Sequence, residues 1–208
     1  LHDRKLPMVL IHKTSTPSLD IPTVTIENKA ATRNLINHLI EVHDRRRILL
    51  VRGNQQQEDA YWREVGFREA LANHGIPFEE TLTVCGSFDR EIAYASMKSF
   101  LNNQDSPEFD AVFAGDDDAA VGVYDALREN GRRIPEDVSV VGFDDAQIAP
   151  FLTPPLTTVM APTEEVGRSA AEQLFCLLDG YKPKPVTLHV TEIVLRRSCG
   201  CNIQHAAS

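Results

Sequence analysis

Long apolar runs, a cysteine framework and an excess of basic residues are all absent from this chain of 208 residues. No apolar stretch approaches the ~20 residues that a membrane-spanning helix needs. The polar start, followed by an apolar stretch only one strand long, does not fit a signal peptide. With 21 Lys and Arg against 30 Asp and Glu, the formal net charge is −9. Because a phosphate backbone is held by clustered cations, we do not expect this segment itself to bind DNA or RNA.

The chain has only four cysteines, which are Cys85, Cys176, Cys199 and Cys201. They are too few and too widely spaced for a dense disulfide framework. The last two form a Cys-Gly-Cys run, which is not the spacing of common zinc motifs. His38 and His43 are five residues apart in a helical pattern, which places them on different faces of the helix. We therefore predict free thiols in a reducing cytosol, with no metal site and no cofactor.

The chain contains the ordinary apolar and charged fractions of a globular protein, 42% and 25%. Short apolar runs alternate with amphipathic helical patterns, the first helix beginning at Asn28 as its predicted N-cap. Strands are expected at 7–12, 23–26, 48–51, 81–84, 111–114, 138–143, 157–160 and 188–195. Helices are expected at 28–43, 58–74, 89–102, 117–130 and 163–178. This alternation predicts an α/β fold with parallel strands and helices on both faces.

Polar and aromatic residues follow the ends of several predicted strands. They are Arg63, Phe88, Asp116–Asp118, Asp144 and Asp145. In a parallel α/β sheet, ligands bind at the carboxyl ends of the strands. Carboxylates accept from hydroxyl groups, a guanidinium donates to oxygens, and a Phe ring stacks on a sugar or a base. The group therefore predicts a site for a small polyhydroxylated or heterocyclic ligand.

Two other interpretations of the acidic residues stay open. The residues Asp116, Asp117 and Asp118 could cap the following helix, which we expect for Asp117 and Asp118 rather than for Asp116. A Mg²⁺-dependent hydrolase could use Asp116 and Asp144. The chain, however, offers no nucleophile with an adjacent base and no glycine-rich phosphate loop, so we predict that it is not an enzyme.

Several runs of this sequence resemble the LacI/GalR family of bacterial transcription regulators, over about Pro7 to Ser198. The runs are Arg63–Leu71 (RxxGFRxAL), Phe109–Ala114 (FDAVFA), Asp116–Gly122 (DDxxAxG), Arg133–Asp145 (RIPEDVSVVGFDD) and Pro154–Val159 (PPLTTV). The resemblance implies a periplasmic-binding-protein-like core: two parallel-sheet lobes with helices on both faces, and a ligand in the cleft between them.

On the plan of that family, the chain divides into two lobes and a tail. The expected parts are 1–24 and 158–181 in a partial N-terminal lobe, 25–157 and 182–200 in the C-terminal lobe, and 201–208 as a tail. Crossovers between the lobes are expected near 25–28, 157–160 and 181–185. The family's first βα units and its helix-turn-helix would precede Leu1, so we expect uncovered apolar edges and marginal stability in the isolated chain.

The matching motifs also imply roles for single residues. Arg63 resembles the family's anchor for ligand oxygens, Phe88 its stacking aromatic and Asp144 its hydroxyl-binding carboxylate. Asp116 stands where the family commonly has Asn, so a pure acceptor replaces an amide. Two further candidates for ligand contact precede Arg63 along the chain, Gln57 and Asp59.

The family works as homodimers, which implies a dimer surface on the predicted helix 117–130 and the loop 151–155. The residues expected there are Val121, Tyr124 and Leu152.

The resemblance thus implies a ligand-sensing domain of a cytoplasmic LacI-type regulator. It would bind a small effector, sugar or nucleobase-like, and couple lobe closure to the operator affinity of a separate DNA-binding head. No membrane partner is expected. Two alternatives stay open: the same sensor fold joined to another signalling domain, which the loosely similar Cys-Gly-Cys end suggests, or a periplasmic sugar receptor.

Overall fold

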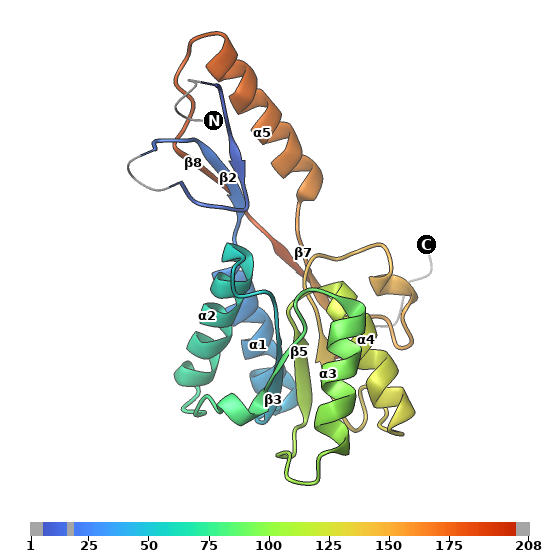
Figure 1. Ribbon diagram of the computed structural model, residues 1–208. Helices are drawn as coiled ribbons and strands as arrows, with labels where there is room; N and C mark the ends of the chain where they lie inside the picture. Colours follow the sequence, from blue (N-terminus) through green and yellow to red (C-terminus); the bar gives the residue numbers. More distant parts are fainter. Residues whose placement is uncertain (1–5, 16–18, 203–208) are drawn as a thin grey trace.

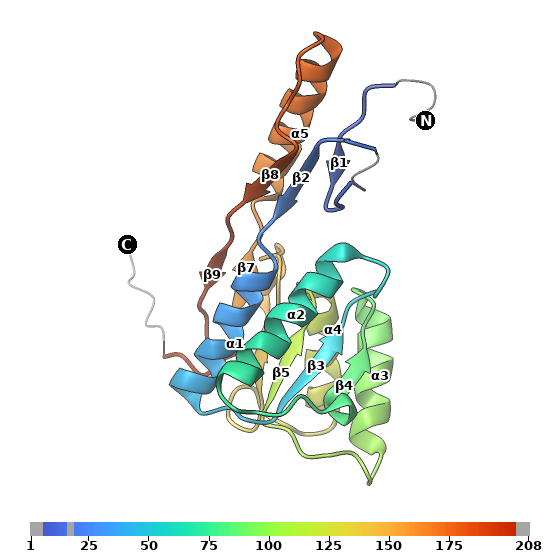
Figure 2. The same cartoon turned by 90° about the vertical axis from the view of Figure 1, so that its left-hand side faces the viewer.

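The computed structural model describes residues 6–15 and 19–202, and it consists of two lobes of unequal size (Figures 1 and 2). The large lobe contains a four-stranded parallel sheet in the order β4-β3-β5-β6. Its strands are β3 (Ile48–Arg52), β4 (Thr83–Cys85), β5 (Ala111–Ala114) and β6 (Ser139–Val141). The predicted α/β fold with parallel strands is confirmed.

Helices cover both faces of the large sheet. Figure 1 shows one pair on one side of the sheet and a second pair on the other. They are α1 (Lys29–His43) with α2 (Glu58–Asn73), and α3 (Arg90–Asn102) with α4 (Asp117–Glu129). Because side chains alternate along a strand, Ile48 and Leu50 pack under α1 and α2, whereas Leu49 and Val51 pack under α3 and α4. The sheet thus lies between two apolar clusters.

The small lobe is built on a three-stranded parallel sheet in the order β1-β2-β8. Its elements are β1 (Leu10–Ile11), β2 (Thr23–Ile26), β8 (Val186–His189) and the helix α5 (Thr163–Leu178). Val166 and Ala170 of α5 pack with Val24 and Ile26 of β2. The described residues also form two short 3-10 helices, η2 (Glu80–Leu82) and η3 (Ala149–Phe151).

Three chain segments connect the lobes. The first follows β2, the second joins β7 (Thr158–Met160) to α5, and the third joins β8 to β9 (Glu192–Val194). β7 and β9 pair antiparallel, and β7 also lies beside the end of β6 through the bridges Val141–Thr157 and Asp144–Met160. The Glu27 backbone N–H donates to the His189 carbonyl at 2.9 Å, which ties the first segment to the third.

The predicted last strand, 188–195, is divided in the structure, and this corrects two expected lobe boundaries. β8 pairs with β2 in the small sheet, whereas β9 pairs with β7. Residues 25–26 and 186–189 therefore lie with the small lobe, and the third crossover follows β8 rather than falling near 181–185. The backbone hydrogen bonds of β2 select this pairing, and no residue pattern in 188–195 marks the division. The rest of the predicted lobe division stays a prediction.

Among the described residues, no helix has both the length and the apolar character to span a membrane.

Candidate ligand-binding cleft

A cleft of about 1160 Å³ lies where the two lobes face each other. Five of the six predicted ligand-binding residues line it: Gln57, Asp59, Arg63, Phe88 and Asp144. They follow β3, β4 and β6 at the carboxyl edge of the large sheet, as the strand-end argument predicts. The small lobe contributes Ile11, His12 and Lys13 to the opposite wall.

Arg63 is the best-anchored side chain of the cleft and is only 5% exposed. Its Nε donates to Asn28 Oδ1 at 2.9 Å, Nη1 to the Gly115 carbonyl at 2.7 Å, and Nη2 to Asp144 Oδ1 at 3.0 Å. The guanidinium carbon lies 3.7 Å from the centroid of the Phe143 ring. A guanidinium has five N–H groups. Three of them bond to described residues of the chain, so two N–H groups remain for ligand oxygens.

Asn28 helps to hold this arrangement, although the sequence predicts it as the N-cap of α1. The Asn28 side chain makes no capping hydrogen bond. Its Oδ1 accepts from Arg63, and its Nδ2 donates to Asp59 Oδ1 at 2.8 Å. The amide is therefore turned toward the cleft, where it orients one cation and one carboxylate.

Phe88 lines the cleft beside Arg63, with its ring centroid 5.2 Å from the guanidinium carbon. Its backbone φ of 59° lies in the left-handed region. A Cβ at Gly53 would lie 2.3 Å from the ring, and a Cβ at Gly115 would lie 2.9 Å from it. The two glycines thus make room for the ring, which lies at the cleft where a ligand can stack on it.

Asp144 and Asp145 follow β6 on a strained turn, with φ values of 107° and 54°. The Asp144 backbone N–H donates to the Val159 carbonyl at 2.7 Å, which fixes the turn against β7. The Asp144 side chain is 41% exposed and keeps Oδ2 available to the cleft beyond its bond to Arg63. Asp145 pairs with Arg196 at 2.7 Å. The turn therefore brings both residues to the cleft, and the Asp145 carboxylate is in addition held by Arg196 after β9.

Two of the three acidic residues after β5, Asp116 and Asp117, have roles that differ from the prediction. Asp116, expected to contact the ligand, is the N-cap of α4: its carboxylate accepts from the Ala119 backbone N–H at 2.8 Å. It is not among the residues that line the cleft. Burial raises the pKa of Asp116 to about 6. A ligand contact by Asp116 stays a prediction, but the capping bond already uses one of its oxygens.

Asp117, expected to cap the helix, instead bridges two segments in the interior. Its Oδ1 accepts from the Thr158 hydroxyl at 2.6 Å, and its Oδ2 accepts from the Ala146 backbone N–H at 2.7 Å. Burial raises the pKa of Asp117 to about 7. The capping prediction for Asp117 is wrong because its position one residue into the helix points the carboxylate at β7 and the loop after β6.

Two polar contacts cross the cleft from lobe to lobe. His12 Nδ1 lies 3.1 Å from Asp59 Oδ2. This hydrogen bond to Asp59 is the main reason that the pKa of His12 is raised. Thr14 donates to Glu58 through its backbone N–H, at 2.6 Å, and through its hydroxyl group. Sequence reasoning missed His12, Lys13 and Glu58, because no local pattern shows that residues so far apart along the chain face each other.

The residues predicted for a dimer surface differ in exposure. Tyr124 is 1% exposed, and its hydroxyl donates to the Pro154 carbonyl at 3.0 Å, so this side chain packs inside the large lobe. Val121 is 8% exposed, and Leu152 is half-buried against the same cluster. Tyr124 therefore offers no surface to a partner, which corrects that residue of the predicted set.

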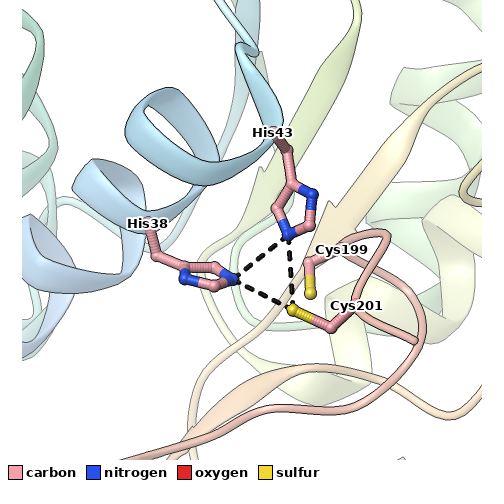
Figure 3. Close-up of side chains that lie close together, drawn as sticks. All are labelled: His38, His43, Cys199 and Cys201. Carbon is pink, nitrogen blue, oxygen red and sulfur yellow. Dashed lines mark hydrogen bonds between the residues drawn. The ribbon is translucent and has the colours of Figure 1, made fainter. Parts of the chain in front are cut away.

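The prediction that His38 and His43 are separated on different faces of the helix is wrong, because their Nε2 atoms lie 3.2 Å apart. Both rings converge with Cys199 and Cys201 at the end of α1 (Figure 3). His43 is the last residue of α1, and its side chain is long enough to reach around the helix end. The two cysteines arrive from a segment more than 150 residues later in the chain, a proximity that spacing does not indicate.

The chain is similar to known proteins over most of its length. The family described as periplasmic binding protein-like domain matches residues 36–199. The HTH-type transcriptional regulator CelR of Thermobifida fusca is 37% identical over 183 residues, covering 88% of this chain and 53% of CelR. The HTH-type transcriptional repressor CytR of Escherichia coli K12 is 32% identical, covering 85% of this chain and 50% of CytR. The chain therefore spans about half the length of these relatives.

Solved structures show the same architecture. The complex of the transcriptional regulator CelR with cellobiose superposes with a TM-score of 0.85 at 35% identity, over 91% of this chain and 58% of that chain. A LacI-family regulatory protein from Chloroflexus aggregans gives a TM-score of 0.84 at 29% identity, over 94% and 69%. These relatives are transcriptional regulators rather than enzymes. The chain thus belongs to the periplasmic binding protein-like family, in the form that LacI-type transcriptional regulators carry as their effector-binding domain.

Proposed function

We propose that the cleft binds a sugar-class effector and reports its presence to a DNA-binding head elsewhere in the protein. The observation that carries the proposal is the Arg63–Asp144 pair, which lies beside the Phe88 ring. The pair supplies donors and an acceptor for vicinal hydroxyl groups, and the ring supplies an apolar face for the C–H side of a sugar. The similarity to a regulator solved with cellobiose supports this ligand class.

The coupling is a population shift between an open and a closed arrangement of the lobes. A ligand that contacts Arg63 and Asp144 on one wall and His12 or Lys13 on the other favours the closed arrangement. The contacts between His12 and Asp59 and between Thr14 and Glu58 belong to the same lobe interface. The ligand changes operator affinity only by the difference between its affinities for the two arrangements.

The whole protein acts as a cytoplasmic homodimer in this proposal, because its relatives are transcriptional regulators. The partner surface is the outer side of α4 together with the loop 151–155. Phe151 in that region is 78% exposed, an apolar side chain that a partner would cover.

The proposal is tested by isothermal calorimetry on the full-length protein with a panel of mono- and disaccharides, including cellobiose, and of nucleosides. We expect a sugar to bind with micromolar affinity, and Asp144→Asn to weaken it tenfold or more, about 1.4 kcal/mol. Asn tolerates the positive φ at this position, so the turn is kept. Asp118→Asn is the matched control, since Asp118 follows the same sheet edge and is exposed outside the cleft. Binding of nucleosides alone, or equal affinity in Asp144→Asn, would contradict the proposal.

A further inference from the structure

Four side chains that commonly bind metal ions meet where α1 ends (Figure 3). His38 and His43 project from the last turns of α1, and Cys199 and Cys201 lie on the segment that follows β9. One donor atom from each of the four lies within 4.8 Å of all the others. All four belong to the large lobe, and none lines the effector cleft.

The separations between donor atoms match those of a tetrahedral zinc site. With Zn–N of about 2.0–2.1 Å and Zn–S of about 2.3 Å, a tetrahedron places two nitrogens about 3.3 Å apart and a nitrogen and a sulfur about 3.5 Å apart. His38 Nε2 and His43 Nε2 are separated by 3.2 Å. Cys201 Sγ lies 3.4 Å from each of these nitrogens. Three donor atoms therefore already surround one point at coordination distances.

The local backbone is shaped to bring the fourth donor to the same point. Gly200 has a φ of 109°, and a Cβ there would lie 3.1 Å from His43 Nδ1. Only glycine fits both this backbone conformation and the close approach, so the Cys-Gly-Cys turn can present two sulfurs to one side. The Ser139 hydroxyl donates to the Cys199 carbonyl at 2.9 Å, which anchors the turn to β6.

Cys199 is fully buried, and a hydroxyl group donates a hydrogen bond to its sulfur. The Thr157 hydroxyl donates to Cys199 Sγ at 3.1 Å. Such a donor stabilises a thiolate, the form in which cysteine binds a metal ion. The Arg196 carbonyl, 3.5 Å from the same sulfur, accepts the thiol proton when no ion is bound.

We propose that His38, His43, Cys199 and Cys201 bind one Zn²⁺ ion as a structural site. Thiolate and imidazole ligands together favour zinc over the hard ions Mg²⁺ and Ca²⁺, which prefer oxygen. Four protein ligands fill the tetrahedron and leave no open position, as in structural rather than catalytic zinc sites. The ion would clamp the segment after β9 to the end of α1.

The site is spatially separate from the cleft. Asn28, which bonds Arg63 and Asp59, stands at the first end of α1, and His43 stands at the other. The 15 residues of the helix put about 22 Å between the two ends. Zinc binding is thus a second property of the domain, independent of which effector it recognises.

The first test is the zinc content of the untagged full-length protein, purified under reducing conditions and measured by plasma mass spectrometry. We expect one zinc ion per chain in the wild type and less than a tenth of that in a His38→Ala, Cys201→Ser double variant. A Cys85→Ser, Cys176→Ser double variant is the matched control, because it removes two cysteines outside the cluster and should keep the zinc. Zinc that remains in the first variant would overturn the proposal.

The second test needs no variant and therefore stands even if the double variant does not fold. Wild-type protein is stripped with a chelator, reduced, and titrated with Co²⁺ and then with Zn²⁺. We expect a visible spectrum of tetrahedral Co²⁺ with thiolate charge-transfer bands that saturates at one ion per chain and disappears when Zn²⁺ is added. A lack of these bands, together with no zinc in the protein as isolated, would overturn the assignment.

Discussion

The two lobes differ in where their apolar side chains lie. In the large lobe, β5 and β6 are buried throughout, and β3 is buried over its first four residues. In the small lobe, β8 alternates exposed and half-buried side chains, and only three of the 16 residues of α5 are buried. Phe175 and Val190 are 66% and 79% exposed. Since buried apolar area is the main stabilising term of folding, the large lobe carries most of the stability of this chain.

This difference predicts that the cost of a core substitution depends strongly on the lobe. The largest effect is expected for Phe113→Ala in β5, because its ring is fully buried and stacks on Phe67 with 6.1 Å between centroids. We expect a loss of about 3–5 kcal/mol in unfolding free energy. Urea denaturation followed by circular dichroism measures it. Val42→Ala, at a side chain of α1 that is 60% exposed, is the control and should stay within about 0.5 kcal/mol.

The next largest loss of unfolding free energy is expected at Asp117, whose buried carboxylate joins β7 to the loop after β6. Asp117→Ala leaves the Thr158 hydroxyl and the Ala146 N–H without their acceptor, which should cost about 2–4 kcal/mol. Asp117→Asn keeps an amide oxygen for one donor and should cost less than about 1 kcal/mol at pH 7. Equal losses in the two variants would show that one amide oxygen does not replace the carboxylate, and that Asp117 acts through the charge or the second acceptor oxygen that both variants lack.

The same residue predicts a pH dependence. Because the pKa of Asp117 is about 7 in the folded chain against 3.8 as its ordinary value, the native state binds more protons between about pH 4 and 7. The free energy of unfolding therefore falls as the pH rises through this window. Asp117→Asn should flatten that fall, while Asp116, with a pKa of about 6, continues to contribute to it. Denaturation midpoints at pH 5 and pH 7.5 test this.

A smaller effect is expected at the contact between the lobes. The raised pKa of His12 means that its ion pair with Asp59 stabilises the closed arrangement below about pH 6.5 and is lost as the pH rises through the raised value. Asp59→Asn should lower the pKa of His12 in an NMR titration of its ring, while costing less than about 1 kcal/mol. A His12 pKa unchanged by this substitution would mean that the two residues do not meet in solution.

The smallest loss of stability is expected for a leucine of the small sheet, which can be compared directly with a leucine of the large sheet. Leu188 in β8 is 54% exposed, whereas Leu50 in β3 is 2% exposed. Leu50→Ala should cost about 2–5 kcal/mol, and Leu188→Ala less than about 0.5 kcal/mol. A loss above about 2 kcal/mol for Leu188→Ala would show that another segment or molecule covers the small sheet in solution. The same measurement on the full-length protein would then show whether the cover is part of the polypeptide or a partner.

Sequence periodicity predicts β2 and α5 of the small lobe as well as the strands of the large lobe, but it does not predict how the small sheet is assembled. Runs such as Ala111–Ala114 are continuous, buried strands, and each is followed by an amphipathic helix, so pattern and packing agree. The small sheet is assembled from segments more than 150 residues apart, and its strands are short and half exposed. A division such as that between β8 and β9 is set by pairing partners rather than by local residues.

Cleft residues that directly follow a strand of the large sheet could be predicted from the sequence. Cleft residues that the small lobe contributes to the opposite wall could not. Arg63, Phe88 and Asp144 follow strands of one sheet, whose order places them together. His12 and Lys13 come from the small lobe. Asp116 caps α4, and Asp117, which was expected to cap it, bridges two interior segments, because a shift of one residue at a helix start redirects a carboxylate by about 100°. The His38 and His43 rings meet the two cysteines only through tertiary contact.

The three connections between the lobes limit how the lobes can move. A single linker would let one lobe swing and twist freely, but here β7 pairs with β9, and Glu27 and Thr191 join the first segment to the third. Twisting or sliding would have to break these hydrogen bonds, whereas bending about a line across the three segments leaves them intact. The lobes thus have one soft degree of freedom, opening and closing, and a ligand in the cleft acts along that coordinate.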